Sequence, residues 1–70
     1  MSTGSTIKEL RIKRQLTQKQ LGKRVGIATA QISNYEMGKM TPRVDTFEKI
    51  LNAMGYTLWA KPISKKEADK

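Results

Sequence analysis

The sequence lacks cysteine and histidine altogether. Without thiols no disulfide can stabilise the fold, and without either residue type a zinc finger and histidine-based catalysis are excluded. A chain of 70 residues buries only about 60% of the surface that its unfolded form exposes. We therefore expect stability from regular helix packing or from a second subunit, and neither a metal ion nor another cofactor.

Long apolar runs and glycine-rich phosphate loops are absent as well. Because no long apolar run occurs and the start, MSTGST, is polar, we expect no membrane span and no signal peptide. We therefore expect a cytoplasmic protein. Asp45 and Glu48 stand three residues apart, but near a helix start two carboxylates simply favour the helix dipole. No set of residues indicates an enzyme.

Negative charge is scarce. Six Asp and Glu residues stand against 14 Lys and Arg residues, a formal net charge of +8. Such an excess suits a polyanionic partner, although a soluble surface rich in lysine would also explain it. Aromatic residues make up 6% of the chain and do not cluster on one strand face, which argues against binding of single-stranded nucleic acid by stacking.

Capping patterns mark the first two helix starts. The run TIKE, with Thr6 as the cap, predicts a helix over 7–14 after a flexible leader over 1–5. The run TQKQ predicts a second helix, in which Thr17 caps the start and Gln20 answers three residues later. The first half of the chain therefore reads as two short helices.

Several glycines stand at positions where a helix ends or where close packing is expected. Gly22 lies beside the apolar stripe of Leu21 and Val25 and would let another helix approach closely. Three further glycines follow apolar residues, where a helix end favours a left-handed backbone: Gly26, Gly38 and Gly55.

The spacing of apolar residues changes within the last third of the chain, from a helical period to an alternating one. The segment TPRVDTFEKILNAM predicts a helix after Pro42, with an apolar face at three- and four-residue steps: Val44, Phe47, Ile50, Leu51 and Met54. The alternation that follows predicts a strand over 56–62, before a charged tail over 63–70. Because a lone strand leaves its backbone groups unpaired, we expect two copies of the chain to pair through Tyr56, Leu58, Trp59 and Ala60. The alternative is an extended tail folded over the chain's own helices.

A third helix follows Gly26 and is expected to bury Ile32 and Tyr35, together with Ala28 and Ile27. Its outward residues are small and uncharged: Thr29, Ala30, Ser33 and Asn34. Thr, Ser and Asn are poorer helix formers than Glu and Lys, so helix stability does not explain their presence.

An uncharged helix face of this kind fits the major groove of a DNA duplex. Short hydroxyl, methyl and amide side chains can touch base edges there, and Asn34 can read adenine. Basic residues around that face suit the phosphates: Arg14, Lys19, Lys23, Lys39 and Arg43. Taken together, these patterns favour binding of double-stranded DNA.

The chain resembles the Cro/Xre-type helix-turn-helix family of phage repressors and bacterial regulators. The resemblance covers about residues 7–55 and is carried by TQ-x-x-L, the hinge VGI, the run ISNYEMGK and the amphipathic last helix. It implies a mainly α, compact four-helix domain like that of lambda repressor over 6–55, whose third helix reads the major groove. To this domain our reading adds the C-terminal strand, paired in a dimer.

The resemblance also implies roles for single residues. Base contacts fall on Thr29, Ala30, Ser33 and Asn34, and contacts to the DNA backbone on Thr17, Gln18, Gln31, Lys39 and Arg43. A structural ion pair of the family maps onto Arg11 and Glu36. Ala30 stands where many relatives have glutamine, so the base specificity of relatives cannot be transferred. Gly22 stands where many relatives have alanine, which costs up to about 1 kcal/mol of helix stability.

The sequence therefore predicts a homodimeric, sequence-specific DNA-binding transcriptional regulator of bacterial or phage origin that acts on the nucleoid. In such families it is most often a repressor at a palindromic operator. The C-terminal strand is similar to that of some antitoxins of the same family. An antitoxin that neutralises a partner toxin and autoregulates its operon is therefore the alternative function.

Overall fold

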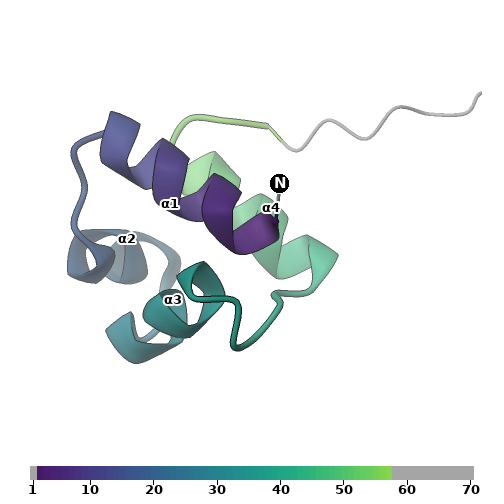
Figure 1. Cartoon of the computed structure of the whole chain (residues 1–70). Coiled ribbons are helices and arrows are strands. Elements are labelled where there is room, and N and C mark those ends of the chain that lie inside the picture. The colour runs from purple at the N-terminus through teal and green to yellow at the C-terminus, as the bar shows by residue number, and fades with distance from the viewer. Residues whose placement is uncertain (1, 58–70) are drawn as a thin grey trace, which may run out of the picture.

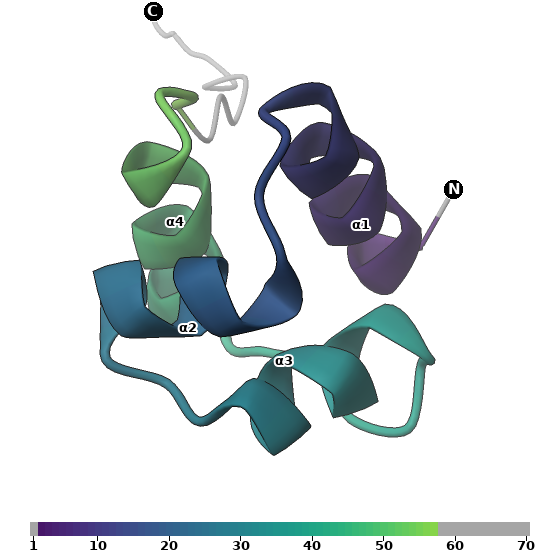
Figure 2. The ribbon, with the colours of Figure 1, turned by 90° about the vertical axis from the view of Figure 1, so that its left-hand side faces the viewer.

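The computed structural model describes residues 2–57, which form four α-helices and contain no strand. The helices are α1 (Thr3–Lys13), α2 (Gln18–Val25), α3 (Thr29–Glu36) and α4 (Val44–Ala53). Helix α3 packs against α1 and α2, and α4 packs against α2 and α1. In both views α3 lies at the lower edge of the domain, and the residues that follow α4, up to residue 57, lie on the opposite side (Figures 1 and 2).

The core takes one fully buried aliphatic side chain from each helix. These four side chains are Ile7, Leu21, Ile32 and Ile50. Burying a side chain of this size contributes about 1.5–3 kcal/mol relative to leaving it exposed. The predicted core positions of α4 at Phe47, Leu51 and Met54 also pack into this cluster. The four short helices are therefore held by one shared apolar centre.

Helix α1 begins four residues earlier than the sequence predicted. Ser2 caps it, because its Oγ accepts a hydrogen bond of 3.0 Å from the Ser5 N–H. The Thr6 hydroxyl instead donates to the Ser2 carbonyl, so the predicted cap at Thr6 was wrong and residues 3–5 of the expected leader are helical. The reason is tertiary: Gly4 packs against the Tyr35 backbone of α3, and this contact extends the helix.

Helix α2 has the capping box that the sequence predicted. The Thr17 Oγ1 accepts from the Gln20 N–H at 3.0 Å, and the Gln20 Oε1 accepts from the Thr17 N–H at 2.8 Å. Gly26 ends the helix with φ +74°, as predicted, and Gly38 and Gly55 also have positive φ. These short-range patterns were readable because each involves residues within one turn.

Two predicted core residues are exposed instead. Ala28 precedes α3 as its N-cap, so it does not lie on the buried face of the helix. Val44 is the first residue of α4 and is 72% exposed. The apolar spacing was right, but both residues stand at helix ends, beyond the reach of the shared core.

The predicted strand over 56–62 is not seen at Tyr56 or Thr57, and its other residues, including Leu58, Trp59 and Ala60, lie outside the described residues, as does the tail over 63–70. Tyr56 is half-buried against the domain's own core. The Arg14 guanidinium lies 4.8 Å from the centre of its ring, a cation–π contact. The proposed role of Tyr56 in dimer formation stays a prediction.

No helix among residues 2–57 has both the length and the apolar character needed to cross a bilayer.

Candidate nucleic-acid interface

Helices α2 and α3 form a compact pair joined by a three-residue turn over 26–28. The Ile27 N–H donates to the Gly22 carbonyl at 2.9 Å. A Cβ at Gly22 would meet the Ile27 carbonyl oxygen and would lie 3.7 Å from the Ile32 side chain, so this glycine admits the turn as well as the neighbouring helix α3. The turn is therefore held tightly against α2, and it fixes the direction in which α3 leaves.

The four residues predicted to contact bases all lie on α3, but their side chains differ in solvent exposure. Thr29 and Ala30 are exposed at the N-terminal end of the helix, whereas Ser33 and Asn34 are half-buried. Ile32 and Tyr35, on the opposite side, are buried in the core. One side of α3 thus anchors the helix while its first turn faces outward.

The outer surface of α3 carries no charge. Glu36 is the helix's only charged residue, and its side chain is 3% exposed. It is also the only acidic residue between positions 10 and 44. Four basic residues that the sequence placed around this face are exposed: Lys19, Lys23, Lys39 and Arg43. We call these four exposed residues, which precede and follow the uncharged helix in the chain, the basic border.

Arg14 does not belong to this basic border. Its guanidinium lies over the Tyr56 ring and close to Gly55, next to the end of α4. That end of the domain is opposite to α3 in both views (Figures 1 and 2). The expectation that Arg14 faces phosphates beside α3 was therefore wrong. The sequence alone did not show that the C-terminal end of α1 would pack against the end of α4.

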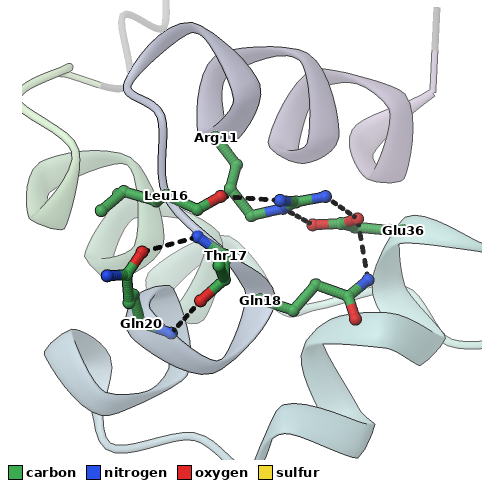
Figure 3. A network of polar contacts seen from close by, with 6 residues as sticks. All are labelled: Arg11, Leu16, Thr17, Gln18, Gln20 and Glu36. Carbon is green, nitrogen blue, oxygen red and sulfur yellow. Dashed lines mark hydrogen bonds and ion pairs between the residues drawn. The ribbon is translucent and has the colours of Figure 1, made fainter.

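A buried ion pair ties the elements around α3 together (Figure 3). Arg11 of α1 donates from Nε to the Glu36 Oε2 at 2.7 Å and from Nη2 to Oε1 at 3.1 Å. Its Nη1 donates to the Leu16 carbonyl at 2.7 Å, and the Gln18 Nε2 donates to the Glu36 Oε1 at 3.0 Å. Three helices therefore meet at the Glu36 carboxylate, and the Arg11 guanidinium also holds the α1–α2 connection.

The predicted DNA-backbone residues differ in how they are held. Thr17 is exposed at the N-cap of α2, beside exposed Lys19. Gln18 is half-buried, and one of its two amide N–H groups is taken by Glu36. Gln31 donates to the Tyr35 hydroxyl at 2.7 Å, so its amide rests along α3.

Sequence reasoning missed how the loop after α3 is attached. The Lys39 and Met40 N–H groups both donate to the Asn34 carbonyl, at 2.9 and 3.3 Å, and the Gly38 N–H donates to the Tyr35 carbonyl at 3.1 Å. The Asn34 Nδ2 also donates to the Met40 sulfur at 3.8 Å. The only signal in the sequence was Gly38, whose positive φ turns the chain back. The loop thus holds Lys39 beside the C-terminal end of α3.

Among residues 2–57, no three acidic side chains are grouped closely enough to hold a metal ion. The arrangement of an exposed polar helix, a basic border and a rigid turn supports binding through surface contacts.

The comparison with known families agrees with this geometry. Residues 7–58 match the sequence profile of the helix-turn-helix family of the Cro/C1 type. The chain belongs to this family. The profile spans α2, the turn and α3, so the helix pair described above is the helix-turn-helix unit of the protein. Domains of this family bind DNA and regulate transcription, and they are not typically enzymes. No curated protein matches the chain.

Proposed function

We propose that this helix-turn-helix protein is a sequence-specific repressor that binds double-stranded DNA as a homodimer. The uncharged outer surface of α3, bordered by exposed Lys and Arg, is the observation that carries this proposal. A solvated helix surface ordinarily carries charged residues with good helix propensity, whereas base edges in the major groove suit small polar groups. As such a regulator, it would act on the nucleoid in the cytoplasm of a bacterium.

In the proposed complex the first turn of α3 enters the major groove. Thr29 and Ala30 then lie nearest the base edges, with Ser33 and Asn34 one turn further along the helix. Phosphates on either side are contacted from exposed residues of α2 and of the loop after α3: Thr17, Lys19, Lys39 and Arg43. The second amide N–H of Gln18, which Glu36 does not use, is free for a phosphate as well.

A dimer fits this arrangement if the copies pair through the residues that follow 57. That end of the described chain lies on the side of the domain away from α3 (Figure 2), so pairing there leaves both recognition helices uncovered. Two helices of a symmetric dimer would enter successive major grooves, roughly 34 Å or 10 base pairs apart. The operator is then an inverted repeat, and bound protein would block access to a promoter.

Selection of bound sites from a random duplex library at about 0.15 M salt tests the function, because this ionic strength already weakens non-specific phosphate binding. We expect an inverted-repeat consensus. A consensus with a single half-site would contradict the dimer but keep the sequence-specific role. Retention of DNA without any consensus would contradict the repressor and favour the antitoxin alternative, for which a stable complex with a partner toxin is the direct test.

Two substitutions separate base reading from phosphate binding. Asn34→Ala is expected to reduce discrimination between the selected site and random duplex by about 1–3 kcal/mol, because it removes a reader of base edges. Arg43→Ala should weaken binding to both duplexes alike and lower the salt slope by about 0.9. Fluorescence anisotropy titrations at several salt concentrations measure both quantities.

Lys13→Ala is the matched control for the loss of charge. Lys13 is exposed at the C-terminal end of α1, which both views place away from α3 (Figures 1 and 2). Its salt slope should stay close to that of the unmodified protein. An equal loss on both duplexes for Asn34→Ala would rule out its reading role, and an equal slope change for Lys13→Ala would rule out a specific contact at Arg43.

A further inference from the structure

The Asn34 side chain is already engaged in the absence of DNA. Its Nδ2 donates to the Met40 sulfur at 3.8 Å. The Met40 N–H also donates to the Asn34 carbonyl at 3.3 Å, and so does the Lys39 N–H at 2.9 Å. The backbone of the loop therefore holds the sulfur beside the amide. A thioether is a weak acceptor, so this contact orients the amide but releases it easily to a stronger acceptor.

Met40 is open to solvent at this position. Its side chain is 45% exposed, and Met37 on the same loop is 58% exposed, whereas Met54 in the core is 3% exposed. Accessible thioethers are the ones that oxidants convert to sulfoxides. Residues 2–57 thus carry one exposed methionine in contact with a proposed base-reading residue, one exposed methionine whose sulfur has no hydrogen bond there, and one buried methionine.

We propose that Met40 is a site of oxidation by hydroperoxides and that its sulfoxide captures the Asn34 amide. In the reaction with hydrogen peroxide, the Met40 sulfur attacks one peroxide oxygen, the O–O bond breaks and an S–O bond forms. The departing hydroxide and the proton released from the transferred oxygen leave as water. Sulfur is oxidised by two electrons and the peroxide is reduced. The new oxygen is a much stronger acceptor than the sulfur was, and it lies on the same side of Asn34.

Capture of the amide would weaken reading of the operator, a consequence that rests on the proposed function. A base must then break a stronger hydrogen bond before it can use the Asn34 Nδ2. Phosphate contacts from Lys39 and Arg43 do not depend on the amide and should remain. Oxidation would therefore reduce affinity for the selected site by about 2- to 10-fold and leave binding to random duplex unchanged.

The test compares the unmodified full chain with Met40→Leu and Met37→Leu before and after treatment with hydrogen peroxide. Mass spectrometry should find one added oxygen at Met37 and at Met40 and none at Met54. The Asn34 side-chain amide signals in ¹H–¹⁵N NMR spectra should move on oxidation of the unmodified chain and of Met37→Leu, and stay in place for Met40→Leu. Both leucine variants keep the volume and apolar character of methionine, so the fold is preserved.

Two results would overturn the proposal: resistance of Met40 under conditions that oxidise Met37, or Asn34 amide signals that do not respond specifically to oxidation of Met40. The DNA arm then uses the duplex obtained by site selection and a random duplex, with Asn34→Ala as the variant that should lose no further affinity on oxidation. A library that returns no consensus contradicts the proposed function but not the oxidation of Met40. The NMR experiment detects the Met40–Asn34 contact without DNA.

Discussion

Arg11→Ala is expected to unfold a large share of the protein at room temperature. The substitution leaves the Glu36 carboxylate, 3% exposed, without its cation, and it also removes the donor to the Leu16 carbonyl. Breaking one side of a buried pair costs about 3–5 kcal/mol. A domain of this size has roughly 3.5–10 kcal/mol of stability in total, so the loss is comparable with the whole. Urea unfolding followed by circular dichroism measures it.

Three variants show whether the unpaired charge causes the loss. Lys13→Ala removes an exposed cation from the same helix and should change stability by less than about 0.5 kcal/mol. Gln18→Ala removes a single hydrogen bond to Glu36 and should cost about 1 kcal/mol. The double variant Arg11→Met with Glu36→Leu, which buries no charge, should recover much of the stability that Arg11→Ala loses. A similar midpoint for Arg11→Ala and Lys13→Ala would contradict the account.

Gly4→Ala is expected to lower stability by about 1–3 kcal/mol, the usual cost of inserting a methyl group into a packed contact. Elsewhere in a helix this exchange would be favourable by up to about 1 kcal/mol. Here a Cβ would meet the Tyr35 carbonyl oxygen and come within 3.2 Å of the Glu36 Cα, so α1 and α3 would have to move apart. The same movement would disturb the Arg11–Glu36 pair. Thermal and urea unfolding measure the loss.

Ser5→Ala is the control for this prediction. Ser5 is exposed and one residue further along α1, and its backbone N–H still reaches the Ser2 cap in the variant. Its stability should stay the same or rise slightly, because alanine favours helices more than serine does. If Gly4→Ala proved as stable as Ser5→Ala, the close approach of α1 and α3 would not constrain the domain.

The proposed recognition surface, the outer side of α3, could be predicted from the sequence in part. Thr29 and Ala30 are exposed, and Ser33 and Asn34 half-buried, because helical spacing places Ile32 and Tyr35 on the opposite side, and this geometry is local. The Arg11–Glu36 pair was inferred from family resemblance, since nothing local links positions 25 residues apart. The Met40 contact with Asn34 had no sequence signal, because it depends on how far the loop folds back after Gly38.

By itself the sequence determined the features that short-range chemistry controls. These are the capping box of Thr17 and Gln20, the left-handed glycines that end helices, the apolar spacing of α4 and the family pattern that identifies a helix-turn-helix protein. Each depends on residues a few positions apart, whose relative geometry is the same in any helix or turn.

Only the tertiary structure decided where helices touch. It showed that Gly4 belongs to α1 because α3 passes so close to it, and that Arg14 packs on Tyr56 rather than beside α3. It also showed that the only acidic residue of α3 is hidden in a pair with α1, which leaves the outer surface of α3 uncharged. These outcomes depend on the packing of segments distant in the chain around one core, and that packing is a property of the whole fold.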